Sequence, residues 1–366
     1  PPRSTLFPYT TLFRSIQPST NFFAIKWLSD ENIDKLDVKM SYVKFHLYNF
    51  IDYWGSDSTI ECKEKSLRRI NLINLQYSSW MIEIKSLFFN TESYKKLKNE
   101  GGFELTHIAR IKKINNNSFN NHEVIELLVG LNYFFSFIVG DWCPPTLPVG
   151  YDDNNNAVWH NYSTPKLYWS HRFSCFDPNK TNCIKDFFPL FMEKIKEKSW
   201  KKTFYNVLYW YINSNASFPA INPCVGIILT LSALERFSFE YLVKEQKLMN
   251  ENKWDRKNYF DKVSELLNCL KIPTAIPDRI KSINKYGSDA PDILSKIRNS
   301  LIHPRKAHNY NDNDYNNAWH LGQWLLELVI LAICGYNGEY SNRITKEYHG
   351  QIEMVPWAKT QEKTSP

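Results

Sequence analysis

Arg298, Asn299 and His303 are the three residues of this chain whose types and spacing best suit chemistry on a phosphate group. Asn299 and His303 are four positions apart, so on a helix their side chains share one face. The apolar residues of the same segment fall in a separate stripe of core-facing width. Pro304 disfavours the helical conformation at His303, so we expect a helix over Asp289–His303 with the imidazole at its end. The trio then points away from its own core, towards solvent or a second chain.

Such a trio could cleave RNA without a metal ion. RNA carries its own nucleophile, the 2′-hydroxyl, so a nuclease has to supply a proton acceptor, a proton donor for the leaving 5′ oxygen and a cation at the phosphate. Histidine exchanges protons near neutral pH, which suits His303 to the proton transfers. The permanently charged fork of Arg298 fits phosphate oxygens, and Asn299 can orient either group. The product would carry a 2′,3′-cyclic phosphate.

The spacing of the trio resembles the signature of the HEPN superfamily, which consists of an arginine, a polar residue, three free positions and a histidine. The resemblance implies a metal-independent ribonuclease that needs no cofactor and acts on RNA as a dimer, within a small helical bundle. The run Trp319–Arg343, which ends in GYNGEYSNR, is similar to the ApeA-like branch, whose members belong to bacterial antiphage defence. That branch implies an abortive-infection type of response and a phage-derived trigger.

The proton transfers also favour two chains. One chain supplies a single histidine at this position, whereas cleavage needs both a base and an acid. We therefore expect a site assembled from two protomers across a two-fold axis, in a homodimer or a higher even-numbered homo-oligomer.

Three further residues could support the trio. Glu235 lies in an otherwise apolar segment, so it is either the partner of a buried basic residue or a residue that orients the catalytic side chains. Arg305 and Lys306 follow the trio directly and are either solvated or add positive potential for RNA binding. Arg298 and His303 could instead simply cap a helix, because the helix dipole favours cations at its C-terminal end.

Two other classes of function stay open. The bundle could be catalytically silent and serve as a dimerisation or nucleotide-sensing module, with the trio as its binding site. Alternatively, the N-terminal region could be the functional centre and recognise a phage component or a carbohydrate. Toxicity on expression that disappears when Arg298 or His303 is altered would favour the nuclease.

Composition and charge set broad limits. The chain has 366 residues and a formal net charge of +7, or 7 − 2 = +5 without Arg3 and Arg14, which is mildly basic and compatible with RNA. Its seven cysteines include no Cys-x-x-Cys pair, so we expect neither a disulfide framework nor a metal site. No apolar run reaches the roughly 18 residues that span a bilayer, so we expect a cytoplasmic protein without a membrane partner.

The first fifteen residues, Pro1–Ser15, read like the translation of a sequencing adapter (PPRSTLFPYTTLFRS). We expect this segment to be artefactual and dispensable for folding.

The rest of the chain predicts an α+β protein, with a strand-rich N-terminal domain that also contains helices, followed by an all-α bundle of HEPN type. We expect a sensor or regulatory domain over 16–215, the bundle over 223–343 and a tail over 344–366. The expected strands are Phe22–Leu28, Val38–Phe50, Ile70–Phe89 and Phe103–Lys112, with a hairpin over 148–159. The expected helices are His122–Val139, a pair within Phe187–Ile212, and Cys224–Glu245, Asp255–Leu270, Asp278–Lys285, Asp289–His303 and Asp314–Cys334.

Overall fold

The computed structural model describes residues 37–51, 53, 59–63, 66–87, 99–161, 173–216, 223–303 and 309–358. Three expectations lie outside these residues: the adapter-like segment Pro1–Ser15, the strand Phe22–Leu28, and the roles of Arg305 and Lys306. The α+β class is confirmed, because an antiparallel sheet precedes a helical region along the chain.

Six antiparallel strands form the main sheet, in the order β10-β9-β2-β7-β6-β5. They are β2 (Tyr42–Tyr48), β5 (Leu72–Tyr77), β6 (Trp80–Ser86), β7 (Leu105–Lys113), β9 (Thr146–Tyr151) and β10 (Ala157–His160). The predicted hairpin is confirmed as β9 and β10. The predicted strand Ile70–Phe89 is wrong as a single strand, because the chain turns at Ser78, whose φ of 53° lies in the left-handed region, and β5 pairs with β6.

Three two-stranded ladders accompany the sheet. They pair β1 (Lys39–Met40) with β8 (Phe119–Asn120), β3 (Thr59–Lys63) with β4 (Ser66–Ile70), and β11 (Glu339–Tyr340) with β12 (Glu353–Met354). Strand β12 lies within the segment 344–366 that we expected as a tail, and it pairs with β11 just before that segment. There Val355 and Trp357 are buried, and the indole of Trp357 donates to the carbonyl of Tyr336 at 2.8 Å.

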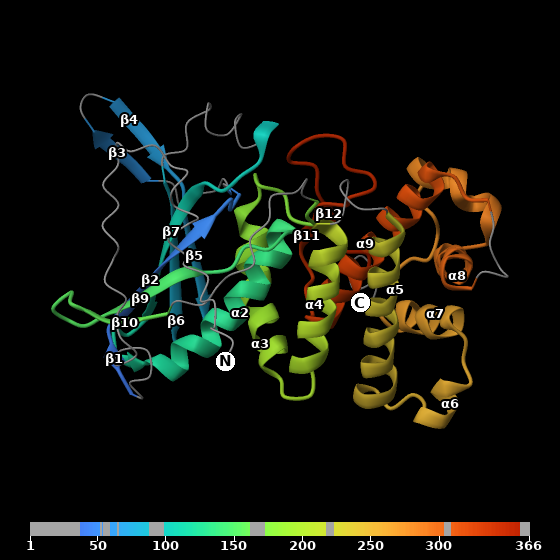
Figure 1. Cartoon of the computed structure of the whole chain (residues 1–366), viewed down its shortest axis with the longest axis horizontal. Helices are drawn as coiled ribbons and strands as arrows, with labels where there is room; N and C mark the ends of the chain where they lie inside the picture. The colour runs from blue at the N-terminus through green and yellow to red at the C-terminus, as the bar shows by residue number, and fades with distance from the viewer. Residues whose placement is uncertain are drawn as a thin grey trace, which may run out of the picture. The chain divides into compact units, whose positions relative to one another are not determined.

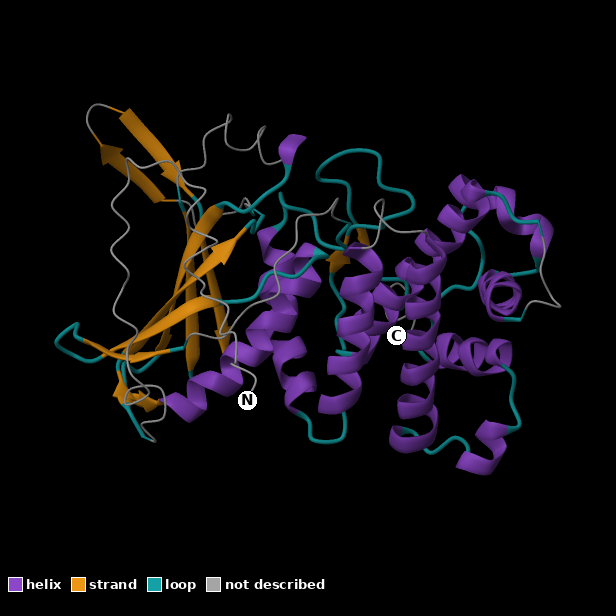
Figure 2. Cartoon of the chain, viewed as in Figure 1, coloured by secondary structure: helices purple, strands orange, loops and turns teal. Residues whose placement is uncertain are grey.

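Helix α2 (Asn121–Val139) covers one face of the sheet, as Figure 2 shows. It begins with a capping box between Asn120 and Glu123, and its Phe135 ring lies 6.2 Å from that of Phe45 on β2. By length and composition α2 could cross a membrane, yet 61% of its apolar window is buried inside the protein. A core helix passes the same test, so this is weak evidence for a membrane span.

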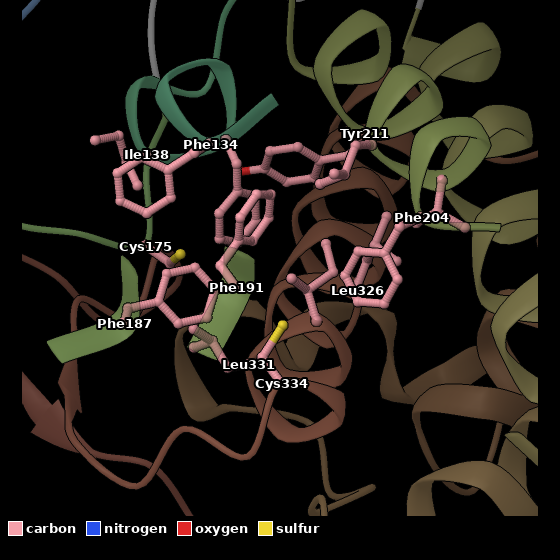
Figure 3. Packing of buried hydrophobic residues seen from close by; sticks show 14 of the residues in the cluster. Phe134, Ile138, Cys175, Phe187, Phe191, Phe204, Tyr211, Leu326, Leu331 and Cys334 are labelled. Carbon is pink, nitrogen blue, oxygen red and sulfur yellow. The ribbon is translucent and has the colours of Figure 1, made fainter. Parts of the chain in front are cut away.

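An aromatic core joins the sheet layer to the helices. Rings of Phe134 on α2, Phe187 and Phe191 on α3 (Thr181–Lys196) and Tyr211 on α4 (Lys201–Ala216) gather in this core, as Figure 3 shows. All four side chains are fully buried. One continuous set of buried residues therefore runs from the sheet to the helical region.

The helical region is built around α5 (Pro223–Phe239), which packs against α4, α7, α8 and α9 (Figure 1). Its other members are a π-helix (Glu240–Glu245), α6 (Glu251–Asp255), α7 (Tyr259–Cys269), a 3-10 helix (Asp278–Tyr286), α8 (Ala290–Ile302) and α9 (Asp312–Ile333). The predicted helices are confirmed apart from their ends. The largest shift is at α3, which begins at Thr181 and not at Phe187. Helix α7 starts after Asn258, because this side chain accepts from the amide of Asp261.

A buried ion pair ties the C-terminal segment to the helices. Arg343 donates from Nε to Oε2 of Glu327 on α9 at 3.0 Å, and a second donor bonds the other carboxylate oxygen. Asn215 accepts from the same guanidinium at 3.1 Å, and the Tyr211 hydroxyl donates to Glu327 at 2.7 Å. Because both charged side chains are almost completely buried, the arginine of the GYNGEYSNR run has a structural role.

Candidate active site

Helix α8 carries Arg298, Asn299 and His303, and its ends form as its sequence predicts. The side chain of Asp289 accepts from the amide of Asp292 at 3.0 Å, which caps the first turn. In the predicted apolar stripe, Ile293, Leu294 and Ile297 are fully buried, and Leu301 is partly buried against the core. The helix ends at Ile302, and His303 has an extended backbone (φ −121°, ψ 101°) while its amide still bonds the carbonyl of Asn299 at 2.9 Å.

Arg298 does not project freely into solvent. Its Nη2 donates to Oε2 of Glu235 on α5 at 3.4 Å, and its guanidinium carbon lies 5.0 Å from the centre of the Tyr259 ring on α7. The side chain is about 25% exposed. The prediction that the trio points away from its own core is therefore wrong for Arg298, whose side chain turns back onto α5 and α7.

Glu235 lies between two cations. Besides Arg298, it accepts from Nζ of Lys262 on α7 at 2.9 Å, and this ammonium group lies 4.5 Å from the centre of the Trp254 ring. One carboxylate cannot neutralise two cations, so the cluster of Glu235, Arg298 and Lys262 keeps a formal charge of +1. The hydrogen bond from Arg298 to Glu235 uses one of the five N–H donors of the guanidinium group. The other N–H groups can therefore donate to an anion.

Tyr259 supports the arginine with its ring rather than with its hydroxyl. The side chain is buried, and its hydroxyl has no hydrogen-bond partner among the described residues. Burial raises the pKa of Tyr259 well above its usual value, which Glu235 reinforces and Arg298 opposes. The phenol is therefore neutral and provides a flat surface on which the guanidinium rests.

Asn299 and His303 remain available to a ligand. Asn299 is half-buried and His303 is exposed. Within 223–303 and 309–358, neither side chain makes a hydrogen bond or an ion pair. The C-terminal part of α8 thus carries both the Arg298 guanidinium, which contacts Glu235 and Tyr259, and the exposed imidazole of His303.

His320 on α9 is no substitute for His303 in proton transfer. It packs edge-on against Phe173 and Trp319, and burial, with Arg343 and Arg279 nearby, lowers its pKa to about 3. It is therefore neutral at physiological pH and cannot donate a proton there. In the described ranges, no three His, Cys, Asp or Glu side chains come together as ligands for a metal ion.

Tyr259 and Lys262 were not singled out from the sequence. They are three positions apart on α7, so they share one face of that helix, and this is the signal that could have found them. A basic partner for Glu235 was one of the two roles expected from the sequence, but several lysines and arginines could have filled that place. Only the packing of α5, α7 and α8 selects Lys262 and Arg298.

Two family models match the chain: the YopA central domain over 36–174 and the YopA C-terminal domain over 197–354. The chain is also 29% identical over 328 residues to the SPbeta prophage-derived uncharacterized protein YopA of Bacillus subtilis (strain 168), which covers 88% of this chain and 73% of the relative. No solved structure matches.

The models separate the two domains between 174 and 197, whereas we had expected a boundary within 215–223. Helix α4 then belongs with the C-terminal domain, where it packs along α5. The whole candidate site, from Glu235 to His303, lies in the part that matches the C-terminal domain.

Proposed function

We propose that this chain is a metal-independent endoribonuclease of a bacterial antiphage system of the abortive-infection type, as its resemblance to the ApeA-like branch of the HEPN superfamily implies. The observation that carries the proposal is the end of α8, where Arg298 is held by Glu235 and Tyr259 while His303 is exposed. We further propose a cytoplasmic location and a phage-derived trigger. The relative of this chain is named as a prophage protein, which fits a role in phage biology.

The reaction follows from these groups. The 2′-hydroxyl of the substrate attacks the adjacent phosphorus while His303 accepts the hydroxyl proton, and the bond from phosphorus to the 5′ oxygen breaks. The fork of Arg298 stabilises the charge that develops on the phosphate oxygens. A protonated imidazole returns one proton to the leaving 5′ oxygen. The products are a 2′,3′-cyclic phosphate and a 5′-hydroxyl end.

Two protomers would complete the site. One exposed imidazole serves as the base, and the same imidazole of a second copy is placed as the acid by a two-fold axis that brings the two α8 ends together. Asn299 lies one turn before His303 and would orient the imidazole or the phosphate. A substitution in Arg298, Asn299 or His303 of one protomer would then affect the site that it forms with the second protomer.

The alternative is a catalytically silent module for dimerisation or nucleotide sensing. The ion pair between Arg298 and Glu235 favours this alternative, because a paired arginine can stabilise the bundle without any substrate. In that case the trio would bind a ligand, and RNA would stay intact.

Expression in bacteria with profiling of total RNA tests the proposal. We expect the intact chain to produce fragments with 2′,3′-cyclic phosphate ends, and we expect His303→Ala to abolish them. His122→Ala is the matched control, because His122 is exposed on α2, far along the chain from the trio. Equal fragmentation by the intact chain and His303→Ala would overturn the assignment, and RNA that stays intact in every culture, including one infected with phage, would favour the silent module.

A further inference from the structure

The main sheet has a second face that no described helix covers (Figure 2). Side chains alternate along β2, so Val43, Phe45 and Leu47 face α2 and the core, while Lys44 and His46 face the other way.

Two cations stand opposite each other on this face. Lys44 on β2 is directly paired in register with Arg110 on β7, and both side chains are exposed. Like charges at directly opposed positions destabilise a sheet. Among the described residues neither cation forms an ion pair, whereas the neighbouring Lys112 pairs with Glu83 at 2.9 Å. Arg110 is also in register with Glu83 on β6, but that carboxylate pairs with Lys112, so a bound anion would relieve the remaining repulsion between Lys44 and Arg110.

Two tyrosine rings lie beside the cations. Tyr42 on β2 and Tyr151 on β9 stack with centroids 4.9 Å apart and planes 12° apart. The Arg110 guanidinium lies 4.3 Å from the centre of the Tyr42 ring, and the Lys44 ammonium lies 5.2 Å from that of Tyr151. The rings hold the cations in place on the strand surface, so less side-chain entropy is lost when an anion binds.

Two carboxylates of the β9–β10 turn are engaged elsewhere. Asp152 accepts from the amides of Asn154 and Asn156 at 2.9 and 2.8 Å, which closes the β9–β10 turn. Asp153 accepts from the hydroxyl of Ser41. These contacts hold both carboxylates within the turn instead of across the cations.

We propose that this face, defined by Tyr42, Lys44, Arg110 and Tyr151 and called here the tyrosine–cation platform, binds single-stranded nucleic acid. Lys44 and Arg110 would contact phosphates, and the Tyr151 ring or the guanidinium plane of Arg110 would stack on a base. A single strand fits better than a duplex, because bases have to be unpaired to stack on side chains. The platform is separate from the α8 site, so the inference does not depend on cleavage there.

Binding of short fluorescent oligonucleotides to the full chain tests the platform. The probes are oligouridylate, oligothymidylate and a duplex of the same length, and the protein carries His303→Ala so that cleavage cannot interfere. We expect both single strands to bind and the duplex to bind more weakly. The double variant Lys44→Gln/Arg110→Gln should weaken binding about tenfold and reduce the slope of log K against log salt by about 1.4, since each contact to a single strand contributes about 0.7.

Lys201→Gln/Lys202→Gln is the matched control, because it removes two exposed charges on α4 and should leave binding unchanged. Tyr151→Leu should weaken binding about fivefold without altering the salt slope, because it removes a stacking surface and no charge. Circular dichroism checks that each variant folds. Absence of binding by the parent chain, equal losses in both double variants, or displacement by an acidic peptide as readily as by oligouridylate would each overturn the proposal.

Discussion

Two pairs of arginine and glutamate in this chain show how burial separates a structural ion pair from one that can serve a ligand. Arg343 and Glu327 are 1% and 0% exposed, and two donors of the guanidinium bond both carboxylate oxygens. Arg298 and Glu235 are 25% and 29% exposed and share a single contact of 3.4 Å. The residue types are identical, but only the second arginine can exchange part of its contact for a phosphate.

The energies of the two pairs should differ accordingly. A buried charge that loses its partner is left in a medium of low polarity, which is strongly unfavourable. A half-exposed pair is screened by water, and its loss has a small effect on folding. We therefore expect that breaking the pair of Arg343 and Glu327 lowers the stability of the fold, and that breaking the pair of Arg298 and Glu235 lowers the activity.

The largest effect is expected for Glu327→Gln. This change leaves the Arg343 charge buried and replaces one of the two carboxylate acceptors by an amide donor, so the free energy of unfolding should fall by about 3 to 5 kcal/mol. Urea unfolding followed by circular dichroism measures it. The double change Glu327→Leu/Arg343→Met should recover part of the loss, and a decrease below about 1 kcal/mol for Glu327→Gln would contradict the structural role.

A pH effect of intermediate size is expected from His320. Burial lowers the pKa of His320 to about 3 in the folded chain, whereas its pKa in the unfolded chain is about 6.5. Between these two pH values His320 is protonated in the unfolded chain and neutral in the folded chain. Stability from this group is complete above about pH 6.5 and is lost as the pH falls towards 3, with a decrease of about 2 kcal/mol between about pH 7 and about pH 5.

Urea unfolding at both pH values checks this prediction. His320→Gln should flatten the difference between them, whereas the exposed His122→Gln should not. An identical pH dependence for the parent chain and His320→Gln would show that other groups cause the loss.

The smallest effect on folding is expected for Glu235→Gln. Stability should change by no more than about 1 kcal/mol, because the pair is half-exposed. RNA cleavage should nevertheless fall about tenfold, because Arg298 loses the contact that fixes its position. Glu251→Gln is the control, since it breaks an exposed pair with Lys244 away from the trio. Unchanged cleavage in Glu235→Gln would remove Glu235 from the site.

Local signals explain what the sequence could predict. The N-cap at Asp289, the buried stripe of α8 and its end at His303 depend on neighbours within a few positions, and all three predictions are confirmed. The partners of Glu235 depend on how three helices pack, and no spacing within one helix contains that information. The same holds for Arg343, which pairs with Asn215 and Glu327 on two other helices.

The most direct test of the central claim is cleavage of purified RNA in the presence of EDTA, with the amount of folded protein measured for each variant. We expect cyclic phosphate ends from the intact chain, at least a hundredfold loss in folded Arg298→Ala and folded His303→Ala, and undiminished cleavage per folded molecule in Arg343→Lys. Cleavage by folded Arg298→Ala or His303→Ala at the rate of the intact chain would contradict it, as would activity that EDTA abolishes and a divalent ion restores.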